Sequence, residues 1–116
     1  MVEIENQSTA IVVLVTAPSQ EVAHQLAKTL LEKKIIACAN LFPVSSLYRW
    51  EGKICEDDEV CLMLKTKADL FHSKLVPAIQ AIHPYQVPEI IALPLVMGAA
   101  SYLAWIDESC SGNAES

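Results

Sequence analysis

The connector at residues 83–89 carries three side chains that could do chemistry within a short and rigid segment. It reads His-Pro-Tyr-Gln-Val-Pro-Glu and presents an imidazole at His83, a phenol at Tyr85 and a carboxylate at Glu89. Each proline fixes its own φ and pushes the preceding residue toward an extended conformation, so the connector has little freedom to relax. Two interpretations follow. The segment is either a stiff turn that ends a helix, with a tyrosine packed on it, or a loop that holds polar groups for binding.

An acidic run at residues 56–59 (Glu-Asp-Asp-Glu) is the second group of side chains that could do chemistry. On a strand, its first and third residues would share one face and its second and fourth the other, with about 6.6 Å between the members of each pair. Such pairs could hold a hard cation weakly, with help from water. The favoured interpretation is a solvated strand edge that deters aggregation and pairs with Arg49 or Lys53.

The sequence contains no pattern that indicates an enzyme. Nucleophilic catalysis needs a nucleophile beside a base, and no spacing supports a pair of Cys55 or Cys61 with His83. The four cysteines include no CxxC pair, which does not fit a structural zinc site, and they are expected to be reduced. The three glycines are isolated, so a P-loop and a dinucleotide fingerprint are both absent. We therefore predict no enzymatic activity.

Charge and hydropathy exclude two classes of partner. The net charge is −6 and the eight basic residues are scattered, whereas nucleic acids and anionic membranes require clustered Lys and Arg. The longest apolar run is far shorter than the ~20 residues that a membrane helix needs. The N-terminal residues are acidic and polar and do not resemble a secretory signal, so a cytoplasmic location is predicted.

Hydrophobic periodicity predicts the elements that position these groups. Four segments have the composition of strands: residues 10–17, 37–50, 53–67 and 89–96. Three segments have helical spacing: residues 19–34, 69–82 and 99–109. Ser19 and Asp69 are the predicted caps of the first two helices, and Gly52 supplies a positive φ in the turn between the second and third strands. Pro77 lies inside the second helical stripe, where we expect a kink or a break.

The order β-α-β-β-α-β predicts an α+β fold of the ferredoxin-like, split βαβ type, with a long hairpin and a short C-terminal helix. An antiparallel sheet of order 4-1-3-2 would place the second and fourth strands, which contain Pro43 and Pro94, at the edges where proline is tolerated. We expect a flexible segment over residues 1–9, a single domain over 10–109 and a disordered tail over 110–116.

The chain is too apolar for a small monomer. Hydrophobic residues make up 53% of it and charged residues 19%, against the usual ~25%. Strands of ~14 residues span ~45 Å, whereas a helix of ~15 residues covers ~23 Å, so the hairpin should project beyond its helix cover. Its outer half carries apolar side chains that need a second subunit to cover them: Leu41, Phe42, Val44, Leu47, Tyr48 and Trp50. The alternative is a hairpin that bends back onto its own subunit.

Motifs in a specific order run from Val12 to about Ile106. They are Thr16-Ala17-Pro18, Ala37-Cys38-Ala39-Asn40-Leu41, Ser46-Leu47-Tyr48-Arg49-Trp50-Glu51-Gly52-Lys53, Lys65-Thr66, His83-Pro84-Tyr85, Pro88-Glu89 and Tyr102-Leu103-x-Trp105. Together they resemble the CutA divalent-cation-tolerance family. The resemblance implies a cytoplasmic, heat-resistant homotrimer of ferredoxin-like subunits, similar to PII signalling proteins and linked to tolerance of copper and other divalent cations.

The resemblance also implies a metal site, which this chain retains only in part. Members for which copper binding is proposed have a Cys before Thr-Ala-Pro and a His-His pair before Pro-Tyr. Those positions are Val15, Ile82 and His83 here, so His83 alone remains as a metal ligand. One imidazole cannot form a tight copper or zinc site, which needs ~3–4 ligands. We therefore predict weak binding of copper or another divalent cation and no firmly held cofactor.

A PII-like trimeric sensor is the alternative function. It would bind a small anionic ligand in clefts between subunits, and the residues expected to line such a cleft are Lys65, Tyr85 and Glu89. They are polar, adjacent to rigid elements and not needed for the core.

Overall fold

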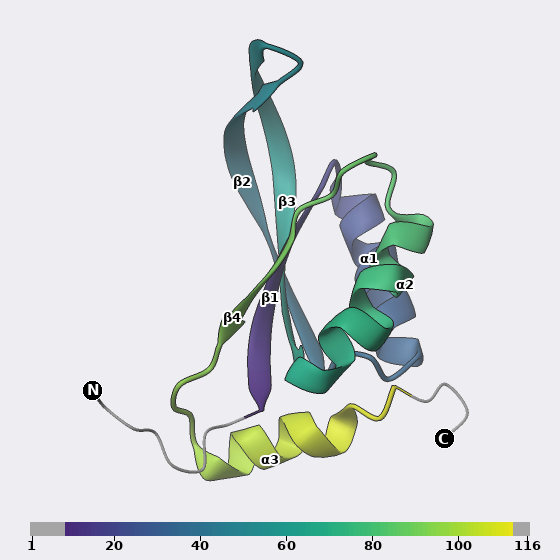
Figure 1. Cartoon of the computed structure of the whole chain (residues 1–116), viewed down its shortest axis with the longest axis vertical. Helices are drawn as coiled ribbons and strands as arrows, with labels where there is room; N and C mark the ends of the chain where they lie inside the picture. Colours follow the sequence, from purple (N-terminus) through teal and green to yellow (C-terminus); the bar gives the residue numbers. More distant parts are fainter. Residues whose placement is uncertain (1–8, 113–116) are drawn as a thin grey trace.

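The computed structural model describes residues 9–112 and shows a four-stranded antiparallel sheet with helices (Figure 1). The strands and regular α-helices are, in chain order, β1 (Ala10–Ala17), α1 (Gln20–Glu32), β2 (Cys38–Trp50), β3 (Lys53–Lys67), α2 (Val76–Ile82), β4 (Ile90–Pro94) and α3 (Ala100–Ser109). The strand order β2-β3-β1-β4 confirms the predicted sheet and the α+β fold. The flexible and disordered ends that we predicted fall mainly on residues 1–8 and 113–116, which lie outside the described residues.

Each of the two edge strands contains a proline, as the predicted sheet order requires. Pro43 lies in β2, which pairs with β3 alone, and Pro94 ends β4, which pairs with β1 alone. Because proline lacks the N–H that a central strand must donate, the sheet accommodates these residues only at its edges.

The core lies between one face of the sheet and helices α1 and α2, which run side by side (Figure 1). Ser19 caps α1 as predicted, since its hydroxyl accepts a hydrogen bond of 3.2 Å from the N–H of Val22. Leu26 and Leu30 of α1 are buried in the same cluster as Val13 of β1 and Leu62 of β3. Each such side chain contributes roughly 1.5–3 kcal/mol through burial.

The predicted second helix is divided into three pieces. A 3-10 turn (Ala68–Leu70) and a π-helical turn (Phe71–Leu75) precede α2, and Pro77 falls in the first turn of α2, where its missing N–H costs least. The prediction that Asp69 caps this helix is wrong, because Asp69 lies inside the 3-10 turn. The backbone fixes the entry instead, since the N–H of Ala68 donates to the carbonyl of Thr9 at 2.7 Å.

The β2–β3 hairpin projects beyond the helices, as predicted (Figure 1). The two strands pair along their whole length, whereas β1 pairs only with the inner part of β3, residues 60–67. Glu51 and Gly52 form the turn, with φ of 50° and 78°, the positive values that a two-residue hairpin loop requires. Leu47 is 66% exposed on this ribbon. The hairpin therefore extends away from the helices and does not fold back onto them.

In the described part of the chain, no helix has the length and apolar character needed to span a bilayer.

Candidate functional site

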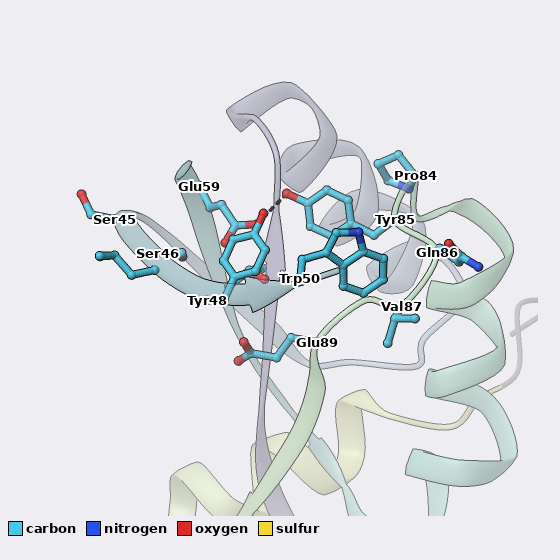
Figure 2. A pocket seen from close by; sticks show the side chains of 12 residues that line it. Ser45, Ser46, Tyr48, Trp50, Glu59, Pro84, Tyr85, Gln86, Val87 and Glu89 are labelled. Atoms are coloured by element: carbon cyan, nitrogen blue, oxygen red, sulfur yellow. Dashed lines mark hydrogen bonds between the residues drawn. The ribbon is translucent and has the colours of Figure 1, made fainter. Parts of the chain in front are cut away.

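A cavity of about 700 Å³ lies between the hairpin and the connector that follows α2 (Figure 2). Its wall is built by Ser45, Ser46, Leu47, Tyr48 and Trp50 of β2, by Glu59 of β3, by Thr16 of β1 and by Pro84, Tyr85, Gln86, Val87 and Glu89 of the connector. The register pairs Val44 with Glu59 and Tyr48 with Cys55, so Tyr48 and Glu59 share one sheet face. Val60 and Leu62, their neighbours on the opposite face, pack in the core with α1.

A hydrogen bond between Tyr85 and Glu59 closes one side of the cavity. The phenolic hydroxyl donates to Oε2 of Glu59 at 2.5 Å, and Glu59 is only 8% exposed (Figure 2). A buried carboxylate needs such a partner because burial removes its hydration. Burial, together with the hydrogen bond to Glu59 and its negative charge, raises the pKa of Tyr85 above its ordinary value. The phenol therefore stays protonated and remains a donor.

Tyr48 makes a second tyrosine–carboxylate pair on the same face, with Asp57. The hydrogen bond to Asp57 raises the pKa of Tyr48 to about 12, and the nearby negative charges act in the same direction. Both phenols are thus neutral near pH 7 and act as hydrogen-bond donors to the two carboxylates.

The connector is held against the sheet through His83. Its backbone is extended, with φ −74° and ψ 134°, as the following proline predicts. Nε2 lies 2.8 Å from the carbonyl oxygen of Thr16, and Nδ1 accepts the N–H of Tyr85 at 3.1 Å. The ring is therefore the neutral tautomer that carries its proton on Nε2 and donates it to Thr16. Its centroid lies 4.8 Å from that of the Tyr85 ring. His83 thus positions Tyr85 at the cavity.

The carboxylate of Glu89 completes the cavity from the end of the connector. Glu89 is exposed and, within residues 9–112, makes no hydrogen bond or ion pair. Burial and the negative charges of Glu89 and Glu59 raise the pKa of the buried Cys61 thiol. At 8% exposure and with a raised pKa, Cys61 is held in its neutral thiol form.

The four predicted site residues do not all come together. The structure places Tyr85 and Glu89 on the same cavity, with His83 behind Tyr85. Lys65 lies elsewhere, because its Nζ contacts Oδ1 of Asn40 at 2.5 Å and it is six residues from Glu59 along β3, about 20 Å at ~3.3 Å per residue. The cavity wall therefore has two carboxylates and, among the described residues, no basic side chain.

The acidic run at residues 56–59 was predicted to be a solvated edge, and at Glu59 the structure corrects this. Glu59 is buried and Asp57 is bonded to a tyrosine, while the expected ion pairs of the acidic run with Arg49 or Lys53 are not formed. Between residues 9 and 112 the one ion pair is Lys67–Asp107, at 3.5 Å. The alternation of the acidic run was the usable signal, because it put its second and fourth carboxylates on one face.

The described residues contain no group of three or more His, Cys, Asp or Glu side chains arranged to hold a metal ion. Both ring nitrogens of His83 already have partners, so a metal ion would have to displace one of these hydrogen bonds. The role of His83 as a metal ligand stays a prediction. Glu59 and Glu89 are the cavity's carboxylates, and they offer hard oxygen ligands.

The fold and the cavity define the class: a split βαβ protein whose long hairpin meets a proline-stiffened connector over an acidic cavity. Residues 11–109 match the family model described as "CutA1 divalent ion tolerance protein". The chain belongs to this family, which confirms the resemblance seen in the sequence.

Similar proteins come from bacteria, archaea and animals. The chain is 48% identical over 99 residues to "Divalent-cation tolerance protein CutA" of Thermus thermophilus, an alignment that covers 84% of this chain and 95% of that protein. It is 45% identical over 97 residues to "Protein CutA" of Homo sapiens, covering 79% of this chain and 51% of the human protein. The chain thus spans about half the length of the human relative.

Solved structures of family members share the fold. The Thermus thermophilus structure "Divalent cation tolerance protein (Cut A1)" superposes with a TM-score of 0.85 at 46% identity and covers 88% of this chain and 99% of that one. "Structure of the Periplasmic divalent cation tolerance protein CutA from Archaeoglobus fulgidus" gives a TM-score of 0.84 at 41% identity over 86% of this chain and 97% of that one.

Proposed function

We propose that the protein acts in tolerance of divalent cations, as a homotrimer that binds copper or another divalent cation weakly. The observation that carries this proposal is the charge of the cavity, which has Glu59 and Glu89 in its wall and no basic side chain among the described residues. Such a cavity attracts cations, because the buried carboxylate of Glu59 and the exposed carboxylate of Glu89 together create a negative potential. The names of the relatives agree, since the Thermus thermophilus protein is called a divalent-cation tolerance protein.

The binding we propose is weak because few ligands are available. One oxygen of Glu59 is committed to Tyr85, and Glu89 is an exposed carboxylate that can turn toward the cavity. Two carboxylates and water give an oxygen site that suits hard cations, and an affinity of about 10⁻⁴–10⁻³ M is typical of sparsely charged oxygen sites. Copper prefers imidazole nitrogen, so copper bound here would also draw on His83 at the expense of one of its hydrogen bonds.

Charge argues against a small anion as the ligand. The carboxylates of Glu59 and Glu89 would repel it, and Lys65, the basic residue expected to bind it, is bonded to Asn40 outside the cavity. No observation favours the PII-like alternative.

The homotrimer is supported by large apolar side chains that are exposed in the single chain. They lie on the hairpin, on β4, in the segment between β4 and α3, and on α3. They include Leu47, Ile54, Ile91, Leu93, Met97 and Trp105. Exposed apolar surface of this extent marks an interface between proteins. Sedimentation equilibrium should give about three times the chain mass of 12.7 kDa, and a folded monomer at micromolar concentration would contradict the trimer. The cytoplasmic location and heat resistance implied by the resemblance belong to the same proposal and can be tested by cell fractionation and a melting curve.

The cation site can be tested with a pair of matched variants. Glu89→Gln keeps the shape of the side chain and removes its charge from the cavity. Glu56→Gln makes the same change on the opposite strand face, where the side chain is exposed and outside the cavity. Calorimetry with Mn²⁺ and Cu²⁺ should show weaker binding to Glu89→Gln and unchanged binding to Glu56→Gln. In a bacterium that lacks its own relative, expression of Glu89→Gln should protect less well against excess metal than the wild type. Equal protection and equal affinity would refute the proposal.

A further inference from the structure

The cavity has a feature that a site for an inorganic cation does not need. Three aromatic rings, those of Tyr48, Trp50 and Tyr85, form part of its wall (Figure 2). A divalent metal ion binds through oxygen, nitrogen or sulfur ligands, to which these ring faces contribute nothing. A volume of about 700 Å³ is also far larger than a metal ion and falls in the ~300–1,000 Å³ range of small-molecule pockets.

The electrostatics of the rings favour a positively charged ligand. The face of an aromatic ring is negative and attracts cations within ~6 Å of the ring centre, most strongly for Trp. Tyr48 and Tyr85 each donate their hydroxyl to a carboxylate, Asp57 and Glu59 respectively. These hydrogen bonds fix the orientation of the two phenols and keep a negative charge beside each ring. Trp50 is 43% exposed in the single chain and lines the cavity with the two tyrosines.

We propose that this cavity binds a small organic cation of the alkylammonium class, with its alkyl groups against Tyr48, Trp50 and Tyr85 and its charge facing Glu59 and Glu89. The site is the one proposed above for divalent cations, but the inference rests on the aromatic wall, which plays no part in metal binding. The two proposals can therefore fail separately.

The hydrogen bonding of the site explains the choice of an alkylated ammonium. Both phenols already spend their donors on carboxylates, and Oε2 of Glu59 already accepts one of them. Glu89 is the carboxylate of the cavity wall that has no hydrogen-bond partner among the described residues. A guanidinium group, with five N–H donors, would leave several unpaired. An alkylated ammonium has few or no donors and needs only ring faces and nearby negative charge.

The first experiment follows the fluorescence of Trp50 during titration with tetramethylammonium chloride. The sequence has two tryptophans, so Trp105→Phe leaves Trp50 as the one reporter. The protein is used as the oligomer whose mass is measured by sedimentation equilibrium. Sodium chloride keeps the ionic strength constant during the titration. We expect a saturable change at millimolar concentration, and choline should bind at least about tenfold more tightly than its neutral isostere 3,3-dimethylbutan-1-ol. Absence of saturation, or equal binding of the neutral isostere, would overturn the proposal.

Variants separate the aromatic wall from the carboxylates. By calorimetry, Trp50→Leu should weaken tetramethylammonium binding at least about tenfold and leave Mn²⁺ binding unchanged, whereas Glu89→Gln should weaken both. Trp105→Leu is the matched control, because Trp105 is also 43% exposed but lies in α3, outside the cavity; at unchanged oligomer mass it should change neither binding. Trp50→Phe keeps an aromatic face and should retain most of the affinity, which guards against a misfolded hairpin. Unchanged tetramethylammonium binding in Trp50→Leu would refute the inference. If the wild type binds tetramethylammonium but not Mn²⁺, only the metal proposal is refuted.

Discussion

Removing the hydroxyl of Tyr85 tests whether the hydrogen bond to Glu59 holds the connector on the sheet. Tyr85→Phe keeps the ring, and hence its contact with the His83 ring, while it removes the 2.5 Å hydrogen bond. The variant leaves Glu59, which is 8% exposed, without its donor.

The size of the expected loss of stability depends on Glu59, the buried acceptor of this hydrogen bond. Hydrogen bonds to charged groups contribute about 1.5–3 kcal/mol, and an ionised carboxylate left unpaired in a buried position incurs a desolvation cost. Tyr85 is only partly buried, so water can replace part of the lost interaction. We therefore expect a loss near the lower end of that range, about 1.5 kcal/mol.

The assay is urea unfolding at pH 7, followed by tryptophan fluorescence at one fixed protein concentration, because the stability of an oligomer depends on concentration. Tyr48→Phe is the control, since it removes a similar phenol–carboxylate hydrogen bond at an exposed site and should cost less. In a Glu59→Leu background, Tyr85→Phe should have almost no further effect, because the hydrogen bond is already absent. A loss in Tyr85→Phe no larger than that in Tyr48→Phe, or an undiminished loss in the Glu59→Leu background, would show that this hydrogen bond does not hold the connector on the sheet.

Three further predictions concern the tyrosines, a helix cap and the hairpin turn. Burial or hydrogen bonding raises the pKa of all three tyrosines, so absorbance at 295 nm should show little phenolate in the native protein at pH ~10, where the urea-unfolded chain is about half ionised. The pKa values of these tyrosines are higher in the folded than in the unfolded protein. The stability that they contribute is therefore complete below pH ~10 and is lost as the pH rises toward the folded pKa values. A free energy of unfolding that does not change above pH ~10 would contradict this. Ser19→Ala should lower the free energy of unfolding by about 1 kcal/mol through loss of the cap, while Ser101→Ala, an exposed change in α3, should stay within about 0.5 kcal/mol; equal urea midpoints for the two would contradict it. Gly52→Ala should cost about 1–2 kcal/mol, since φ at this position is 78°, and an unchanged urea midpoint would show that the turn tolerates a side chain.

Local patterns in the sequence predicted the elements well. The bounds of β1 and β3 agree with the strand-like runs, and the sheet order is the one predicted from the order of the elements, with Pro43 and Pro94 in its edge strands. The N-cap at Ser19 was predictable because capping is a local interaction. The cap at Asp69 was not, because the chain enters that turn through a hydrogen bond from Ala68 to Thr9, which lies far away in sequence.

The candidate site was only half predictable, for the same physical reason. Tyr85 and Glu89 stand out because two prolines stiffen the segment that carries them. Glu59 did not stand out, because its partner Tyr85 is 26 residues away in sequence. The two side chains meet only when the connector packs against the sheet. Lys65 was predicted to line the cleft because it is polar and adjacent to a rigid element, whereas the register of β2 and β3 sets it beside Asn40. Which polar groups meet depends on contacts between elements that are distant in sequence, and the residue pattern of a single strand does not predict such contacts.

Cation binding between the hairpin and the connector can be tested directly in solution. The measurement is the broadening of backbone amide NMR signals by Mn²⁺ added at substoichiometric amounts. If cations bind there, the amides of residues 57–59, 85–87 and 89 should broaden first, and Glu89→Gln should suppress this effect. Broadening centred on Glu21 and Glu32 of α1, or spread evenly over the acidic surface, would contradict it.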